Sequence, residues 1–459
     1  MSVFADPSFA LRRTRLVAAV VIAVVVSGCN RTPSVDDAPA PPTLQPAVAA
    51  PPIRIEPWRL PVGQGAAQPD LVATSDGRLL LSWIESRGDD DAAVHTLQFA
   101  SLDATAATAT WSAPRTIAQG RDWFVNWADT PHIAVTADGA LWAHWLQKSA
   151  AATYAYDIAL VRSSDGGARW SAPVLVNDDG TASEHGFVSL WPAGRDRLGV
   201  AWLDGRAMAQ GDAVDHDAHA GHAAPAGATD VPGAPTMSLR STTFAVDLAR
   251  HGDTALDLST CDCCQTDVAA TANGAVLAYR DRSDDEIRDI RLIRQVDGQW
   301  QPSQPVHADG WKMPACPVNG PALATNADAV LVGWYTAADD TPQVRLARSA
   351  DGGRTFSAPI VVERGAAVQG RVAVALDDRA AWVLWLREDA RGQSIWLARY
   401  SPDLTSELQR VEVARLHGRG RATGFPQLEL AGNRGHAVWT DVVGGTPQLH
   451  GAVFIATQR

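Results

Sequence analysis

Residues 162–176 read RSSDGGARWSAPVLV, and residues 348–362 read RSADGGRTFSAPIVV. Both copies hold a serine, an aspartate and two glycines, followed by an aromatic residue and an apolar run. Aspartate and glycine favour tight turns, because the short carboxylate bonds nearby backbone and glycine adopts left-handed conformations. A turn that recurs between apolar runs predicts a repeated β architecture, so it marks structure rather than a reacting group.

Seven further segments share a hairpin pattern, in which two apolar runs flank a turn rich in Gly, Asp or Asn. They end in the aromatic residues Trp83, Trp145, Trp202, Tyr279, Trp334, Trp385 and Trp439. A third strand, a turn and a fourth strand follow most of these hairpins. Repeated units of this kind predict an all-β fold, a β-propeller of four-stranded blades. We expect seven blades, with six as the alternative.

The two ends of the repeat region complement each other. The last unit, which ends in PQLHGAVFIATQR (447–459), supplies three strands, and PIRIEPWRLP (52–61) precedes the first unit as an isolated strand. Joining both in one blade would close the ring and remove exposed sheet edges. We therefore expect residues 52–459 to form one propeller, interrupted by a His-rich insertion at 209–235.

The SxDGGxxW pattern of the two copies resembles the Asp box of sialidase-like propellers. The resemblance implies that Asp165 with Trp170, and Asp351 with Phe356, make structural turns on the face away from the active site. It also implies an exo-acting glycoside hydrolase for an anionic sugar such as sialic acid. Such enzymes use an arginine cluster, a tyrosine nucleophile and assisting carboxylates. One departure is at 67–69, where the family's clamp arginine is usually found and this chain reads Ala67-Gln68-Pro69.

The loops expected on one face of the propeller hold the unusual polar residues. The loop YRDRSDDEIRDI (279–290) offers Tyr279 as a nucleophile, with Asp281 and Glu286 as carboxylates that assist proton transfer. The candidate substrate-binding residues are Arg206, Arg280, Arg282, Arg288, Glu184 and His185. The alternative is that the charged loop is a self-paired, solvated salt-bridge network. Trp123, Trp127 and Trp311 either stack on sugar rings or plug the channel.

Four cysteines fall in loops of adjacent blades: Cys261, Cys263, Cys264 and Cys316. In an exported protein two disulfides are one interpretation, and four cysteines allow three pairings. A sulfur-rich site that suits copper(I) or zinc is the other. The neighbouring insertion holds His216, His219 and His222, which belong either to a disordered loop or to a metal-capturing tract.

The N-terminal segment is a targeting signal rather than part of the fold. Arg12, Arg13 and Arg15 precede the apolar run LVAAVVIAVVVSG, which ends at Cys29. This arrangement resembles the lipobox of bacterial lipoproteins, which implies cleavage after residue 28, lipidation of Cys29 and anchoring to a membrane. Asn30 favours the outer membrane. An ordinary secretory signal and an uncleaved anchor are the alternatives. Residues 30–51, rich in Pro and Ala, form a tether.

The net charge of −12 argues against a nucleic-acid partner, which needs a basic surface. Three functions stay open on the sequence. The first is a sialidase-like exo-glycosidase, and the second is a non-catalytic propeller that binds a glycan, a protein or a metal. The third is a structural envelope protein with a plugged channel.

Overall fold

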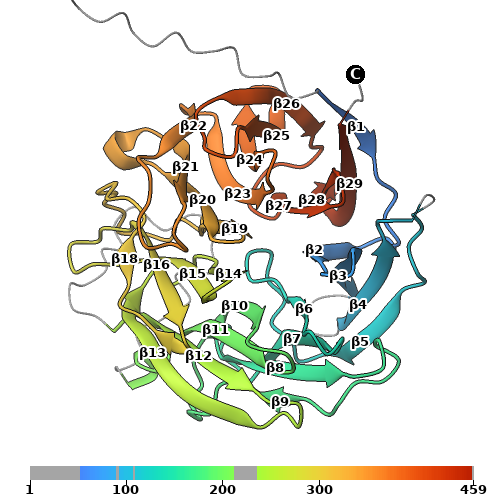
Figure 1. The fold of residues 1–459 in the computed structure, drawn as a ribbon. Helices are drawn as coiled ribbons and strands as arrows, with labels where there is room; N and C mark the ends of the chain where they lie inside the picture. Colours follow the sequence, from blue (N-terminus) through green and yellow to red (C-terminus); the bar gives the residue numbers. More distant parts are fainter. Residues whose placement is uncertain (1–51, 89–92, 107–108, 211–234, 457–459) are drawn as a thin grey trace, which may run out of the picture. The chain divides into compact units, whose positions relative to one another are not determined.

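The computed structural model describes residues 52–88, 93–106, 109–210 and 235–456. The strands of the unit Val48–Arg459 form seven antiparallel sheets, arranged as the blades of a ring (Figure 1). The predicted all-β, seven-bladed propeller is confirmed. Cys29, the tether and the three histidines of the insertion lie outside the described residues. Within those residues no helix is long and apolar enough to cross a membrane.

Blades 1 to 4 follow one another along the chain. Blade 1 comprises β2 (Ala66–Ala73), β3 (Arg78–Arg87), β4 (Val94–Asp103) and β5 (Arg115–Gly120); blade 2 comprises β6 (Ile133–Val135), β7 (Leu141–Lys148), β8 (Tyr156–Ser163) and β9 (Val174–Leu175). Blade 3 comprises β10 (His185–Pro192), β11 (Leu198–Asp204), β12 (Met237–Phe244) and β13 (Arg250–Thr260); blade 4 comprises β14 (Asp267–Thr271), β15 (Gly274–Arg280), β16 (Ile290–Val296), β17 (Gln299–Trp300) and β18 (Gln304–Pro305).

The remaining strands build blades 5 to 7. Blade 5 comprises β19 (Ala322–Asn326), β20 (Ala329–Thr336), β21 (Gln343–Ser349) and β22 (Ile360–Arg364); blade 6 comprises β23 (Val368–Leu376), β24 (Ala381–Asp389), β25 (Gly392–Tyr400) and β26 (Glu407–Arg415). Blade 7 comprises β27 (Gly424–Ala431), β28 (Arg434–Val443), β29 (Thr446–Ala456) and β1 (Ile53–Pro57). Two 3-10 turns, η2 (Met208–Gln210) and η4 (Ala338–Asp340), complete the described elements.

The first and last strands close the ring in blade 7. β1 pairs with β29 in antiparallel register from Ile53 opposite Ala456 to Pro57 opposite Ala452. The strand expected at 52–61 therefore supplies the missing fourth strand. Because both ends of the chain's repeat region meet in one sheet, blade 7 has four strands and the ring is closed.

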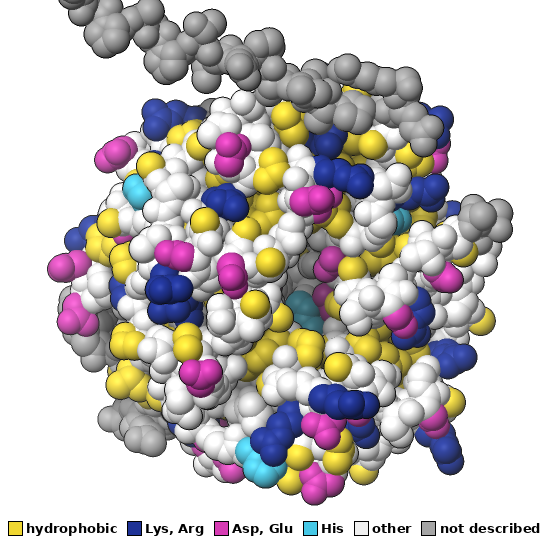
Figure 2. Space-filling model, viewed as in Figure 1, with side chains coloured by type: hydrophobic (Ala, Val, Ile, Leu, Met, Phe, Trp, Pro, Cys, Tyr) yellow, Lys and Arg dark blue, Asp and Glu magenta, His cyan; other side chains and the backbone are white. Residues whose placement is uncertain are grey.

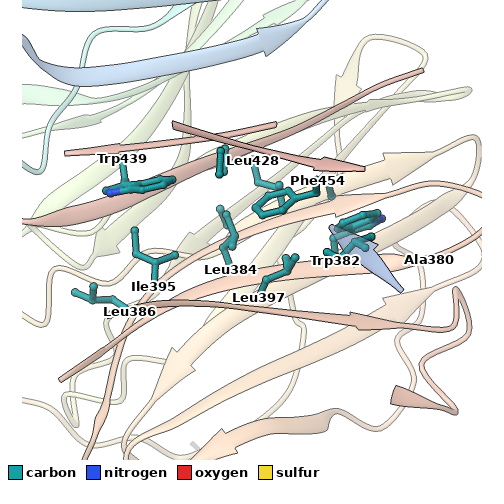
Figure 3. Close-up of a cluster of buried hydrophobic side chains, with 14 of the residues drawn as sticks. Ala380, Trp382, Leu384, Leu386, Ile395, Leu397, Leu428, Trp439 and Phe454 are labelled. Carbon is teal, nitrogen blue, oxygen red and sulfur yellow. The ribbon is translucent and has the colours of Figure 1, made fainter. Parts of the chain in front are cut away.

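Aromatic side chains at the predicted second-strand positions form the core. Trp83, Trp202, Trp334 and Trp385 are at most 1% exposed. Between blades 6 and 7 the side chains of Trp382, Leu384, Leu397 and Phe454 pack together (Figure 3). Large aromatic rings fill the wedge between neighbouring blades, which explains why tryptophan recurs there.

The two Asp boxes have the same hydrogen-bond geometry. In the first, the Ser163 hydroxyl donates to Asp165 at 2.9 Å, and Asp165 accepts the backbone N–H of Arg169 at 2.9 Å. In the second, Asp351 accepts from the Ser349 hydroxyl at 2.7 Å and from the Thr355 N–H at 2.9 Å. The aromatic residues pack beneath these turns, Trp170 beside Phe99 and Phe356 against the core between blades 4 and 5. The boxes are turns between third and fourth strands, as expected.

Candidate functional site

Four inner strands begin with the same distortion. Gln68, Phe187, Arg371 and Phe425 have positive φ angles of 49°, 50°, 52° and 53°. Each lies at a register shift between the first and second strands of its blade. A bulge redirects a side chain, and non-glycine residues in left-handed conformations concentrate at functional sites. These four positions therefore mark the channel mouth as the candidate site.

Three of the side chains at this mouth converge. The rings of Trp127 and Phe425 lie 5.6 Å apart. The Arg371 guanidinium lies 4.3 Å from the ring centre of Phe425 and 5.4 Å from that of Trp127. Its Nη1 donates to the Thr423 carbonyl, and Asn319 Oδ1 accepts the Arg371 backbone N–H at 2.7 Å. The cation is thus held in place by contacts from three blades.

A pocket of about 160 Å³ opens beside these residues. It is lined by Ala67, Gln68, Pro69, Trp127, Thr130, Ala422, Gly424, Phe425, Thr440, Val442, Gly445 and Pro447. Gln68 Oε1 is buried there and has no hydrogen-bond partner. Figure 2 shows the hollow at the centre of the ring, with acidic and histidine side chains around it. The pocket combines apolar walls with a few polar groups, as small-ligand sites do.

Arg371 supplies the positive charge of this site. Within the part of the chain that the structure describes, no carboxylate lies within ion-pair distance of its side chain. Burial lowers the pKa of Arg371 to about 9; repulsion from Arg421 acts in the same direction, and the attraction of Glu388 opposes both. A half-buried cation without a carboxylate in direct contact favours an anionic ligand, because a bound carboxylate would offset its desolvation.

The loop at 122–132, which leads into blade 2, has residues on both the pocket and blade 3. Trp127 and Thr130 face the pocket, while Asp129 turns toward blade 3 and accepts the Phe187 N–H at 2.8 Å. The other oxygen of Asp129 is buried without a partner, and burial raises the pKa of Asp129 to about 7. Gly186 is required here, because a Cβ at this position would lie 2.0 Å from Asp129 Oδ2.

Glu184 and His185 lie beside this loop but make contacts away from the pocket. The Tyr156 hydroxyl donates to Glu184 at 2.6 Å, and burial raises the pKa of Glu184 to about 8. Tyr156 is itself buried against Phe124, with the ring centres 4.2 Å apart. His185 is fully buried, and its Nε2 lies 2.9 Å from Asp179 Oδ2. Both residues therefore stabilise the boundary between blades 2 and 3.

Arg280, which was predicted to bind a substrate carboxylate, is buried, and its side-chain donors are bonded to the protein. Its guanidinium donates to the backbone carbonyls of Asn319 at 2.9 Å, Arg288 at 2.5 Å and Tyr335 at 2.7 Å. It also stacks on Trp311, at 4.9 Å from the ring centre. This arginine joins blades 4 and 5, and its donors point into protein rather than toward a ligand.

The other predicted arginines are paired with carboxylates. Arg282 and Arg288 both bind Glu286, at 2.8 and 2.7 Å. Arg206 binds Asp204 at 2.7 Å and Asp253 at 3.3 Å. The structure places these side chains in ion pairs within the protein, and Arg282 and Arg288 are buried rather than solvated.

Tyr279, Asp281 and Glu286 each have different partners in the structure. The hydroxyl of Tyr279 donates to Asp257 on β13, and burial raises its pKa far above the usual value. Asp281 is half-buried, and burial raises its pKa to about 6. Glu286 is held by the two arginines, which lower its pKa against the effect of burial. Among the residues that the structure describes, Tyr279, Asp281, Glu286 and the predicted arginines do not line the pocket at the channel mouth.

The four cysteines lie together and form the disulfides Cys261–Cys264 and Cys263–Cys316. The first bridge is buried and the second is half-buried. Of the three tryptophans expected at this face, Trp123 and Trp311 are buried and only Trp127 is half-buried.

Sequence reasoning did not identify Arg371 or Phe425 as site residues. A signal was present: GR at 370–371, GF at 424–425 and GF at 186–187 each lie in the first residues of an inner strand. The same position in blade 1 is Ala67-Gln68, where the family's clamp arginine was expected. A comparison of these four dipeptides would have pointed to the bulges.

No protein-family model and no curated protein matches the sequence. Solved structures with a similar fold include the K499G mutant of NanB sialidase from Streptococcus pneumoniae, with 8% identity and a TM-score of 0.43 over 87% of this chain and 94% of that one. The polysaccharide lyase Uly1 has 7% identity and a TM-score of 0.48 over 90% and 91%. An α-L-arabinanase from Penicillium chrysogenum has 11% identity and a TM-score of 0.41 over 88% and 97%.

Sialidases are thus among the structures that this chain resembles, as its two Asp boxes predict. At these identities the likeness concerns fold alone, so activity has to be inferred from the chain's own residues.

Proposed function

We propose that this protein binds the terminal acidic sugar of a glycan at the mouth of its central channel. The observation that carries this proposal is Arg371, a half-buried cation without a carboxylate partner in the described chain, stacked on Phe425 and Trp127. A carboxylate on the sugar would form an ion pair with the Arg371 guanidinium. The apolar face of the sugar ring would pack on the aromatic side chains.

The size of the pocket favours a single sugar unit. Its volume of about 160 Å³ is below the ~300–1,000 Å³ of pockets that enclose drug-sized ligands. Gln68 adds a buried oxygen without a partner, which can accept a sugar hydroxyl. The predicted lipid anchor at Cys29 places this binding at the cell envelope, by this proposal at the outer membrane.

The lining favours binding over hydrolysis. Glycoside hydrolysis needs two carboxyl groups beside the scissile bond. No Asp or Glu lines the described pocket. Three acids, Asp70, Asp129 and Asp441, adjoin lining residues in the sequence, and each accepts at least one backbone N–H. We therefore prefer a non-catalytic glycan-binding role to the exo-glycosidase interpretation.

Calorimetric titration of the purified full chain with sialic acid, glucuronic acid and neutral galactose tests the proposal. We expect the acidic sugars to bind and Arg371→Met to weaken them at least tenfold, with Arg371→Lys intermediate. Arg169→Met is the matched control, because Arg169 is 89% exposed on an Asp box and does not line the pocket. Equal binding by Arg371→Met, or no binding of any acidic sugar, would reject the proposal.

A fluorogenic sialoside separates binding from catalysis. If the chain hydrolyses it and Asp129→Asn abolishes turnover while sugar affinity is kept, the protein is a hydrolase at this mouth. We expect no turnover above that of the uncatalysed reaction.

A further inference from the structure

The sulfur atoms of three cysteines gather at one point of the loop that leads into blade 4. The Sγ atoms of Cys261, Cys263 and Cys264 all lie within 4.8 Å of one another. We propose that these three cysteines, once reduced, bind one copper(I) ion. This site is separate from the sugar pocket, so the two proposals stand or fall independently.

The spacing suits a three-coordinate thiolate site. Metal–sulfur bonds of about 2.3 Å in a trigonal arrangement place the sulfurs about 4 Å apart. The backbone of the loop is held by bonds that do not involve sulfur. Cys261 donates its N–H to the Arg280 carbonyl at 3.0 Å, and Asp262 accepts the Met237 N–H at 3.2 Å. The loop therefore has contacts that keep the sulfurs together after the disulfides open.

The surroundings are rich in further sulfur. The chain has four methionines, and Met313 lies three residues before Cys316 in the sequence. Met237 is fully buried and pairs with Thr260, the residue before Cys261. Met208 and Cys263 pack against the same hydrophobic cluster that contains Met237. Thiolate and thioether sulfur select copper(I) over harder ions.

An ion pair also holds the cysteine loop without involving sulfur. Arg282 Nη1 lies 2.9 Å from Asp262, the residue between Cys261 and Cys263. Cysteine binds metal in its deprotonated form. The ion itself then offsets part of the negative charge of three thiolates.

The site requires reduction first. Each disulfide accepts two electrons and two protons from an external dithiol, which is itself oxidised to a disulfide. Two such exchanges give four protein thiols. Three of these thiols release their protons to the buffer as their sulfurs bind copper(I), and Cys316 remains a free thiol. The half-buried bridge Cys263–Cys316 is the more accessible point of attack.

Copper(I) titration of the dithiothreitol-reduced and then desalted full chain tests this proposal under anaerobic conditions, with bicinchoninate as competitor. We expect one ion per reduced chain, none per oxidised chain, and sulfur-to-copper absorption in the near ultraviolet. Cys263→Ser should weaken binding at least 100-fold. Cys316→Ser is the matched control, because it removes the same bridge without removing one of the three clustered sulfurs, and it should bind as the reduced wild type does.

Four results would overturn the site. The first is equal binding by oxidised chain or by reduced Cys263→Ser. The second is loss of binding in a variant with His216, His219 and His222 changed to alanine, since the ion would then sit on the insertion. The third is unfolding of the reduced chain by circular dichroism, which would make the bridges structural staples. Tighter binding of zinc that depends equally on Cys316 would also overturn it, in favour of a four-cysteine zinc site.

Discussion

Asp70 Oδ2 in blade 1 accepts the backbone N–H of Ile133 in blade 2 at 2.8 Å. Asp129 bonds Phe187 in the same way between blades 2 and 3, and Asp267 bonds Leu323 between blades 4 and 5 at 2.6 Å. The N–H groups at the beginning of inner strands need partners, because they have no neighbouring strand toward the channel. Acidic side chains at these points therefore fasten one blade to the next.

Removing the Asp70 contact should destabilise the ring. Asp70→Ala leaves a buried N–H unsatisfied and takes away the carboxylate that lies 3.1 Å from His132, so we expect a loss of about 1–3 kcal/mol in the free energy of unfolding. Asp70→Asn keeps an acceptor oxygen and should lose less. Urea denaturation measures both. Equal losses in the two variants would show that the hydrogen bond contributes nothing.

Asp129 should make stability depend on pH. Its pKa is raised to about 7 in the folded chain by burial, against about 4 in an unfolded chain. The folded state therefore binds more protons between these values, and the free energy of unfolding falls as pH rises from about 4 to about 7. Asp129→Asn removes this term and should be more stable than the wild type at pH 8, by about 2–4 kcal/mol at most.

Thermal unfolding of wild type and Asp129→Asn from pH 5 to pH 8 checks the sign. Asp267 and Glu429, with pKa values raised to about 6 and about 8, titrate in both proteins, so the difference reports Asp129 together with its effect on the pKa values of Glu184 and His132. Parallel curves would mean that Asp129 is charged at neutral pH in the folded chain.

Arg280 should behave as a structural arginine. Arg280→Met leaves three buried carbonyls without their donor, and we expect a loss of about 2–4 kcal/mol in the free energy of unfolding. Sugar binding below the melting temperature should be unchanged. Arg371→Met should show the reverse, with weakened sugar binding and a melting temperature near that of the wild type. A stable Arg280→Met variant that no longer binds sugar would restore the clamp role.

The sequence predicted the blades well, because the residues that mark them have roles that depend on local structure. Asp165 and Asp351 stand in turns whose geometry needs aspartate and glycine, and the tryptophans of the second strands can only be buried. Both are local rules, and both predict the blades. Pairing of β1 with β29 followed from counting strands.

The site was harder to predict because the role of an arginine depends on its neighbours in space. Arg280 and Arg371 look alike in sequence, each beside an apolar strand. Arg280 bonds three carbonyls and stacks on one aromatic ring, whereas Arg371 bonds one carbonyl and lies over two rings. Those partners come from other blades, so only the closed ring distinguishes a structural arginine from one open to a ligand.

The pairing of β1 with β29 should contribute measurably to the free energy of unfolding. Ile53 is 8% exposed and packs in the cluster that contains Trp382 and Phe454, while its N–H is bonded by Gln409 at 2.9 Å. Ile53→Asp places a charge in that cluster, and we expect a loss of about 2–4 kcal/mol in the free energy of unfolding. Arg54→Ala, one residue along the same strand with its side chain 64% exposed, should change it by less than about 0.5 kcal/mol. Chemical denaturation of both variants compares them directly. If Ile53→Asp is as stable as Arg54→Ala, β1 does not hold the ring closed in solution, and blade 7 is stable with three strands.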